Sequence, residues 1–303
     1  MVAMSTRFIP STSAKRVAAI GDIRRLPELI RPAFQPDDDF DPIPTPKHGD
    51  WLAEHDEIGQ SFDDYIASDP IVPDPRRQVI YLQPVGRFID PPAMFLDRLN
   101  AYAGAFFKMA VRVLPAIGDR TVHLTTRIHP YMGNRQLLTR DIFEILLDIL
   151  PADAFCILAI TMDDLYPHPS WNFVFGQASP GDRVGVFSFA RYNPVFYGES
   201  RSRDADEIML RRSLRVLAHE TCHMFSLAHC IYFRCVMNGS NHLGESDSRP
   251  LHLCPVCLRK LQYAVGFDLE LRYRGLLAFY KKIGLMDEAD WTEGRLKRII
   301  GDR

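Results

Sequence analysis

The 303-residue sequence has no apolar run close to the roughly 20 residues that a membrane-spanning helix needs. It also lacks the short apolar core of a secretory signal. Neither sign of charge dominates, because 36 Lys and Arg face 38 Asp and Glu, giving a net charge of −2. A near-neutral chain has no general attraction for nucleic acid or anionic lipid. We therefore expect no membrane and no nucleic acid among its partners.

Cysteine is scarce, with six residues in the chain, and four of these crowd together near the C-terminal side. The four are Cys230, Cys235, Cys254 and Cys257. Without a secretion signal thiols stay reduced, so a metal explains this cluster better than two disulfides do. Two close pairs separated by a loop are typical of a structural zinc held by four thiolates. The alternative is a zinc-ribbon-like nucleic-acid module, but only Arg259-Lys260 suggests the basic surface that it requires.

A short histidine motif lies just before the cysteines. His219-Glu220-Thr221-Cys222-His223 has the pattern HExxH. On a helix, four residues advance about 40° beyond one turn, so both imidazoles face one point and can bind one zinc. Zinc lowers the pKa of its bound water towards ~7, and Glu220 is placed to take the proton of that water. The motif therefore predicts a catalytic zinc with Glu220 as general base.

His229 is the candidate third ligand of this zinc. On a continuous helix it would lie about 240° away from His223, on another face. It reaches the metal only if the helix ends near Ser226 and the chain turns back. Three histidines and one water form an open site, as catalytic zinc requires, whereas structural sites are closed by four protein ligands. The four-cysteine zinc would then hold the turn that orients His229.

The rest of the chain predicts an α/β protein in three parts. Residues 1–75, rich in Pro and Asp, form a partly irregular N-terminal extension. The catalytic domain, with its four-cysteine unit, covers 76–265, and a helical segment covers 266–303. Apolar patterns predict strands at 78–83, 122–128, 155–161, 171–176 and 184–190, and helices at 91–114, 139–150, 207–227 and, in two parts, 270–300. Their order predicts a mixed sheet with a hairpin at one edge and 155–161 as a central strand.

The two motifs together resemble the archaemetzincin family, and within it the eukaryotic archaemetzincin-2 type. The resemblance is carried by the HExxH motif with Ser226 and His229-Cys230, then Cys235-Val-Met237, then Cys254-x-x-Cys257. Further similar runs are Trp171-Asn-Phe-Val-Phe-Gly-Gln-Ala-Ser, Phe187-Ser-Phe-Ala-Arg-Tyr, Asn238-Gly-Ser-Asn-His-Leu and Ala33-Phe-Gln-Pro.

This resemblance implies a metzincin-like zincin fold: a twisted mixed β-sheet, an active-site helix and a helical C-terminal subdomain with the structural four-cysteine zinc. It also implies that Met237 is the Met-turn residue beneath the three histidines. Trp171, Asn172 and Phe173 become candidates for a substrate-binding edge strand, with a purely structural edge strand as the equal alternative. Ser226 stands where the family usually has Gly, and a left-handed conformation there costs a non-Gly residue about 1 kcal/mol.

We therefore expect a zinc metallopeptidase that hydrolyses peptide bonds by attack of a zinc-bound water activated by Glu220, as an endopeptidase or an aminopeptidase. It would bind two zinc ions per chain, one catalytic and one structural, and act on peptides or proteins as a monomer. The alternative is a catalytically inactive, zinc-stabilised interaction protein, although such a scaffold has no need of Glu220, which is not a ligand. We expect an intracellular location, cytoplasmic or nuclear, with mitochondrial import as the alternative.

Overall fold

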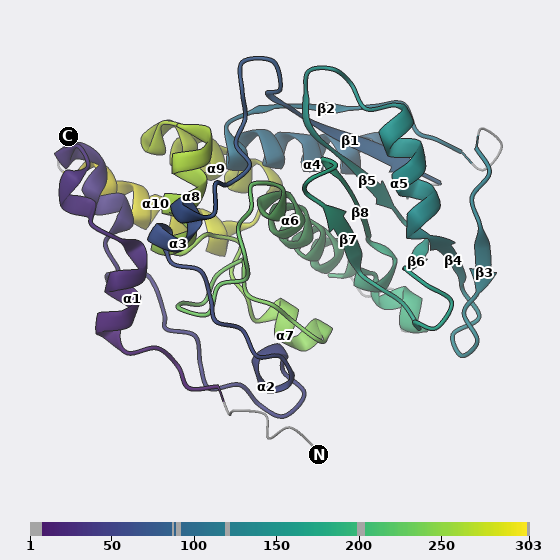
Figure 1. The fold of residues 1–303 in the computed structure, drawn as a ribbon, viewed down its shortest axis with the longest axis horizontal. Coiled ribbons are helices and arrows are strands. Elements are labelled where there is room, and N and C mark those ends of the chain that lie inside the picture. Colours follow the sequence, from purple (N-terminus) through teal and green to yellow (C-terminus); the bar gives the residue numbers. More distant parts are fainter. Residues whose placement is uncertain (1–7, 87, 89–91, 119–121, 199–203, 302–303) are drawn as a thin grey trace. The chain divides into compact units, whose positions relative to one another are not determined.

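The computed structural model describes residues 8–86, 88, 92–118, 122–198 and 204–301 (Figure 1). The chain divides into two compact units. The helical unit contains residues 8–71, 105–107 and 225–301, and the sheet unit contains the described residues of 72–104 and 108–224. Within the described part of the chain, no helix is both long enough and apolar enough to cross a membrane.

The sheet unit is built on a five-stranded mixed sheet with the strand order β2-β1-β5-β8-β7. Its strands are β1 (Val79–Val85), β2 (Ala110–Val113), β5 (Ala154–Thr161), β7 (Gly176–Ser179) and β8 (Val184–Ser188). The first four strands in this order are parallel, and β7 pairs antiparallel with β8 at the edge. A second sheet joins β3 (Thr126–Ile128), β4 (Arg135–Leu138) and β6 (Asp164–Tyr166). The predicted mixed sheet, with a hairpin edge and 155–161 at its centre, is confirmed.

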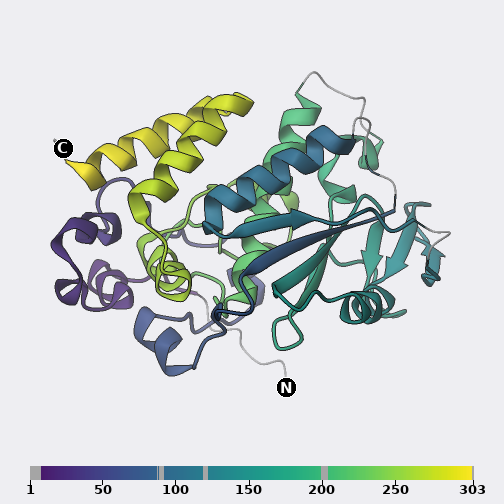
Figure 2. The same cartoon turned by 90° about the horizontal axis from the view of Figure 1, so that it is seen from above.

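The two faces of the larger sheet are covered by different helices. Alternate residues of β1, β5 and β8, such as Val79, Ile157 and Val186, pack against Ile142 and Leu146 of α5 (Thr139–Asp148). Helices α4 (Pro92–Phe107) and α6 (Ala205–Met224) lie over the opposite face (Figure 2). Because side chains alternate between the faces of a strand, the three inner strands β1, β5 and β8 are buried on both sides, whereas the edge strands β2 and β7 are partly exposed. The sheet thus gives α6 a rigid, apolar support.

The helix predicted at 91–114 is shorter than expected. Helix α4 ends at Phe107, Lys108 adopts a left-handed conformation with φ 52°, and the chain continues as β2. The start of the predicted helix, Pro91, lies outside the described residues. Apolar residues four apart, such as Met109 and Val113, satisfy the strand period of two as well as the helical period. Periodicity therefore could not separate the helix from the strand that follows it.

The strand predicted at 171–176 is also wrong, apart from Gly176, which begins β7, and Val174, which forms an isolated bridge with Leu165. Arg127 donates hydrogen bonds to the backbone carbonyls of Trp171 and Asn172, the latter at 2.9 Å. The side chain of Gln136 donates a further bond of 2.9 Å to the carbonyl of Asn172. Side-chain donors thus take the carbonyl groups that a strand ladder would use. Likewise, the strand predicted at 122–128 is reduced to β3.

The helical unit combines the N-terminal segment with the C-terminal helices. Its elements are α1 (Ser13–Ile20), η1 (Ile23–Arg25), η2 (Glu28–Phe34), α2 (Trp51–Glu54), α3 (Phe62–Ala67), α7 (Leu243–Asp247), α8 (Pro255–Val265), α9 (Leu269–Ile283) and α10 (Met286–Ile300). The two helices predicted at 270–300 are confirmed, and Gly284 ends α9 with φ 82°. The N-terminal segment carries short helices joined by irregular chain.

Arg295 on α10 ties the N-terminal segment to the C-terminal helices. Its side chain is fully buried and donates to the carbonyl oxygens of Pro32, Ala33 and Gln35 at 2.8, 3.1 and 3.2 Å. It also pairs with the carboxylate of Asp39 at 3.2 Å. A buried cation is costly unless its donors find acceptors, and here backbone carbonyls supply most of them. The irregular segment is therefore part of the core of this unit.

A buried ion pair in the sheet unit gives a first prediction. Arg191 makes two hydrogen bonds of 2.8 Å to Asp164, and the two side chains are 7% and 0% exposed. Asp164→Ala leaves a buried guanidinium without its partner, so we expect a loss of about 3–5 kcal/mol in the free energy of unfolding, measured by urea titration. The control is Glu144→Ala, which removes an exposed pair with Arg140 and costs less than about 1 kcal/mol. Equal losses in the two variants would contradict this assignment.

Candidate metal centres

The four cysteines of the predicted structural site come together in the helical unit. Each offers a sulfur atom, and these atoms all lie within 4.8 Å of one another. All four side chains are buried, and none forms a disulfide. The Sγ atoms of Cys230 and Cys254 are 3.5 Å apart. A tetrahedral zinc with bonds of about 2.3 Å places its sulfur ligands about 3.8 Å apart, so this donor set fits zinc.

Local backbone structure positions the last two of these cysteines. Cys254 is the N-cap of α8, Pro255 occupies its first turn, and Cys257 follows within that turn. Proline is well suited to this position because it has no N–H to leave unsatisfied. The N–H of Cys254 donates to Cys235 Sγ at 3.2 Å. The positive end of a helix and its free N–H groups stabilise thiolates, so the start of α8 suits a cation held by sulfur.

The electrostatics of the cluster already favour one thiolate. Burial alone would raise the pKa of the Cys230 thiol, because a charge is poorly solvated in the interior. Hydrogen bonds from Cys235, Cys254 and Cys257 outweigh burial and hold the pKa of Cys230 well below its ordinary value. Thiolates so close together repel one another unless a cation lies among them. The arrangement therefore matches the needs of a divalent metal.

Asn238 organises the loop between the cysteine pairs, although no role was predicted for it from the sequence. Its side-chain oxygen accepts the N–H of Cys235 at 2.8 Å. Its amide donates to the carbonyls of Cys230 and Phe233 at 2.7 and 2.9 Å. The neighbouring Met237 is fully buried, and its carbonyl accepts the N–H of Cys230 at 2.8 Å. The available signal was a polar Asn in a run dense in buried residues, which implies a satisfied amide.

In the sheet unit, α6 carries the HExxH motif as predicted. The Nε2 atoms of His219 and His223 are 3.1 Å apart, and their rings stand nearly perpendicular at a centroid distance of 4.7 Å. Two nitrogen ligands of a tetrahedral zinc lie about 3.3 Å apart, so the pair fits a shared metal. His219 is buried, while Glu220 and His223 are half-buried. Packing of α6 on β7 and β8 holds the helix that carries these rings.

The helix ends at Met224, and Ser226 then has the left-handed φ of 63°. The predicted departure from the helix near Ser226 is confirmed. The Oγ of Ser226 accepts the N–H of Ile71 at 3.0 Å. The hydroxyl of Tyr65 donates to the carbonyl of Phe225 at 2.7 Å. Two parts of the N-terminal segment therefore fix this turn through its backbone and its side chain.

Gln60 makes a further contact with the same turn. Its amide donates to the carbonyl of Ser226 at 3.2 Å, and its side-chain oxygen accepts the N–H of Ala228 at 3.1 Å. Lys260 on α8, which is 1% exposed, donates to the same side-chain oxygen at 3.0 Å. Gln60 therefore bridges the backbone of Ser226 and Ala228. It is itself held by α8, the helix that carries Cys257.

His229 lies in the helical unit, against the N-terminal segment. Its Nδ1 is 2.6 Å from Glu57 Oε1, and the same oxygen accepts the indole N–H of Trp51 at 2.7 Å. The rings of Trp51 and His229 meet edge to face at 5.1 Å. Burial would raise the pKa of Glu57, but its bonds with His229 and Trp51 outweigh burial and lower it. Glu57 is therefore a carboxylate at neutral pH, able only to accept hydrogen bonds.

A third group of possible metal ligands in the helical unit is satisfied by hydrogen bonds. It consists of Asp50, His242 and Glu245. The Nδ1 of His242 caps α7 by accepting the N–H of Glu245 at 3.1 Å, so its Nε2 carries the proton and donates to Asp50 at 3.1 Å. The Glu245 carboxylate accepts the N–H groups of Trp51 and Asn241 at 2.9 and 2.8 Å. These contacts explain the cluster without a metal.

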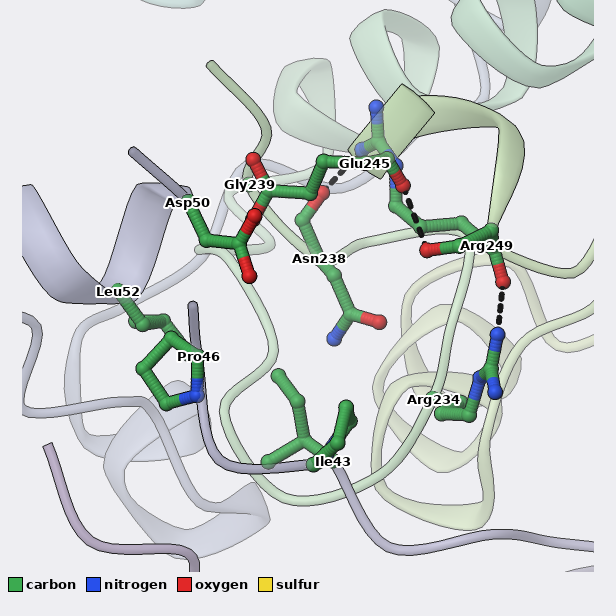
Figure 3. A pocket seen from close by; sticks show the side chains of 11 residues that line it. Ile43, Pro46, Asp50, Leu52, Arg234, Asn238, Gly239, Glu245 and Arg249 are labelled. Carbon is green, nitrogen blue, oxygen red and sulfur yellow. Dashed lines mark hydrogen bonds between the residues drawn. The ribbon is translucent and has the colours of Figure 1, made fainter. Parts of the chain in front are cut away.

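Asp50 and Glu245 of this group also border a small cavity of about 70 Å³ (Figure 3). Arg249 donates to the carbonyl of Asn238 along one side, and Arg234 donates to the carbonyl of Ser248. Ligand pockets commonly measure about 300–1,000 Å³, so this space is too small for a peptide substrate. Its lining belongs to the scaffold that holds the N-terminal segment in place.

The basic pair that suggested a nucleic-acid module faces inward. Arg259 lies over the ring of Phe62 at 3.8 Å and donates to the carbonyls of Ile20 and Asp22. Lys260 is engaged by Gln60, as described above. Both cations are used to hold the N-terminal segment, so neither contributes to a basic surface.

Comparisons with known proteins agree on one family. The sequence profile of Peptidase family M54 matches residues 132–263. Archaemetzincin-2 of Macaca fascicularis is 39% identical over 295 residues, which cover 88% of this chain and 80% of that protein. Archaemetzincin-1 of Homo sapiens is 34% identical over 261 residues, with coverages of 77% and 52%. The solved archaemetzincin of Methanopyrus kandleri is 27% identical and covers 65% of this chain and 99% of its own, with a TM-score of 0.48.

The family profile and the archaemetzincin sequences define the class of protein as a zinc metallopeptidase, a hydrolase of peptide bonds. The chain belongs to the archaemetzincin family. The resemblance read from the motifs is thereby confirmed, as is a four-cysteine cluster in the C-terminal region.

The turn at Ser226 yields a second prediction. Ser226→Ala keeps the left-handed strain and loses the acceptor for Ile71, so we expect the free energy of unfolding to fall by about 1–2 kcal/mol. Ser226→Gly loses the same bond but relieves about 1 kcal/mol of strain, and should remain within about 0.5 kcal/mol of the wild type. Urea unfolding of the two variants side by side checks this order. An alanine variant as stable as the glycine variant would show that the turn is not strained.

Proposed function

We propose that the protein cleaves peptide bonds at a zinc ion held by His219, His223 and His229, with Glu220 as the general base. The observation that carries the proposal is the 3.1 Å separation of the His219 and His223 Nε2 atoms on α6. That spacing matches two ligands of one zinc, and Glu220 follows the first of them on a helix held by the sheet. Membership of a metallopeptidase family supports the same reading.

When bound, zinc supplies an acidic water and an electrophile that polarises the scissile carbonyl. The proton transfers are carried out by residues of this chain. The Glu220 carboxylate takes the proton of the attacking water and delivers it to the departing amine. Its own protonation state therefore alternates during each turnover, which an amide side chain in its place cannot do.

The third ligand depends on the turn after α6. Ser226, with φ 63°, redirects the chain directly after the helix, and His229 follows three residues later. This is the bend that the motif needs if His229 is to serve the same ion as His219 and His223. The buried Met237, next to Asn238 in the same loop, is proposed as the Met-turn residue of the site.

We assign a second, structural zinc to Cys230, Cys235, Cys254 and Cys257. Four protein ligands close the coordination sphere, so this ion has no position for a substrate. Its role is to fasten the loop that begins at Cys230, immediately after His229. Two zinc ions per chain follow from this assignment.

The substrate is proposed to be a peptide or protein, cut internally or at its N-terminus. Trp171, Asn172 and Phe173 remain candidates for contacting it, and the 60% exposure of Trp171 leaves a large apolar side chain in solvent. Phe173 is stacked against the guanidinium of Arg191 at 3.5 Å, so its ring is held by a residue of the buried pair with Asp164. We further propose that the chain acts as a monomer inside the cell, without nucleic acid.

The test of the mechanism is Glu220→Gln. Because the amide cannot accept the proton of the attacking water, we expect peptide cleavage to fall by at least about 10²–10⁴-fold. Zinc content should stay at two per chain, since Glu220 is not a ligand. Glu207→Gln, on the exposed side of α6, serves as control and should cleave normally.

A peptide-library digest read by mass spectrometry measures this loss and also separates internal cuts from removal of N-terminal residues. Unchanged cleavage in Glu220→Gln would refute the mechanism. Absence of cleavage in the wild type, with two zinc ions bound, would favour an inactive interaction protein.

The structural zinc leads to a separate prediction. Cys257→Ser should lower the zinc content from two ions per chain to one and lower the melting temperature, because the cluster loses a ligand of a closed site. Cys156→Ala, at a buried cysteine in β5, is the control and should keep both ions. Zinc is counted by elemental analysis of the purified proteins. Retention of two ions by Cys257→Ser would contradict the four-thiolate assignment.

A further inference from the structure

We propose that Glu57, in the N-terminal segment, is the residue that positions His229 for zinc. The inference rests on the proposed function, because it requires His229 to be a ligand. Glu57 lies 172 positions before His229 in the sequence, yet its Oε1 is 2.6 Å from His229 Nδ1. The two side chains are 20% and 21% exposed, so the bond is largely shielded from solvent.

The chemistry of imidazole gives this contact its consequence. A neutral histidine carries one proton, and a carboxylate can only accept, so the proton belongs on Nδ1 and the lone pair on Nε2. Nε2 is the nitrogen on the far side of the ring from Glu57. Zinc-binding histidines commonly donate their other N–H to a carboxylate, which fixes the tautomer and the ring orientation and strengthens the ligand.

His229 needs such support more than the other two histidines do. His219 and His223 are carried by α6, whose packing on the sheet sets their direction. His229 is on irregular chain, where a side chain has several rotamers to choose from. A ligand that is free to rotate loses conformational entropy when the metal binds, and a prior hydrogen bond removes part of that cost.

Glu57 is itself held in place. The indole N–H of Trp51 donates to the same Oε1 at 2.7 Å, and the indole ring packs on His229. The backbone N–H of Trp51 is bound by the Glu245 carboxylate at 2.9 Å. Gly239 lies against the indole, where an added Cβ would come within 2.4 Å of the ring. The Glu57 carboxylate is thus held through Trp51 by further hydrogen bonds and packing, which a chance ion pair on the surface would lack.

The segment from Trp51 to Gln60 therefore supports the third ligand in two ways. Gln60 fixes the backbone at Ser226 and Ala228, and Glu57 fixes the ring of His229. Both contacts come from one stretch of chain, and the carbonyl of Gln60 accepts a bond from the buried Lys260. The N-terminal segment thus holds both the backbone before His229 and the ring of His229 itself.

The test compares Glu57→Gln with Glu54→Gln, an exposed glutamate three residues away, in the full-length protein. Zinc affinity is measured by competition with a chromophoric chelator, in which the four-thiolate ion and the histidine ion are removed in separate steps. We expect Glu57→Gln to weaken the histidine step by about 10–100-fold and to leave the thiolate step unchanged. Glu54→Gln should match the wild type in both steps.

Cobalt provides a readout that a purely structural role would not change. With Co²⁺ in the histidine site, Glu57→Gln should shift the visible absorption bands, because the basicity and orientation of one ligand have changed. Trp51→Phe, which keeps a ring but removes the N–H bound to Glu57, should weaken the histidine step by a smaller factor. This second variant keeps the test decisive if Glu57→Gln folds poorly.

His229→Ala separates this inference from the proposed function. It should lose the histidine-bound ion and keep the thiolate-bound ion. If His229→Ala retains both ions at full affinity, the three-histidine site itself is wrong. If His229→Ala loses the ion but Glu57→Gln matches Glu54→Gln in affinity and in cobalt spectrum, only the positioning role of Glu57 is overturned.

Discussion

The chain must change direction abruptly after α6, and much of the helical unit serves that requirement. The helix ends at Met224, Ser226 takes a left-handed φ of 63°, and Cys230 enters the thiol cluster four residues later. Such a turn is strained for a residue with a side chain and will not persist on local preference alone. Hydrogen bonds from Tyr65, Gln60 and Ile71 hold its backbone and side chain. Without them, His229 would have no defined position.

The two metal centres make different demands on the fold. A helix packed on a sheet carries His219 and His223, and both lie on one face of this rigid element. The thiol cluster instead collects ligands from a loop and from the start of α8, so its order depends on Asn238 and on the helix terminus. Along the sequence, the residues between α6 and Cys230 form irregular chain. Long-range side-chain contacts hold these residues in place of secondary structure.

Buried cations explain why the N-terminal segment is well ordered despite its irregular sequence. Arg295, Arg259 and Lys260 each direct their donors to backbone carbonyls of that segment. Carbonyls of irregular chain have no ladder partners, and a buried guanidinium or ammonium group needs several acceptors. The carbonyls and the buried cations thus satisfy each other's hydrogen-bonding needs. The result is a segment rich in Pro and Asp that packs as part of the core.

The two groups of candidate metal ligands could be picked out from the sequence, because their members lie close together along the chain and follow fixed spacings. The HExxH helix, the cysteine pairs and the bend at Ser226 all belong to local patterns of this kind. The mixed sheet with its hairpin edge was also predictable from alternating and continuous apolar runs. Errors arose where one pattern fits two structures, as at 91–114, or where side-chain donors such as Arg127 replace strand pairing, as at 171–176.

The amino-acid sequence by itself determined the family and the candidate metal ligands that local spacing can bring together. Tertiary structure alone decided how His229 is supported. Glu57 and Gln60 act on residues 172 and 168 positions further along the chain. No periodicity or spacing rule connects positions so far apart, because their contact depends on how the N-terminal segment packs against α8, α10 and the loop that follows α6. That packing rests on buried arginines and on single hydrogen bonds, which become visible only once the chain is folded.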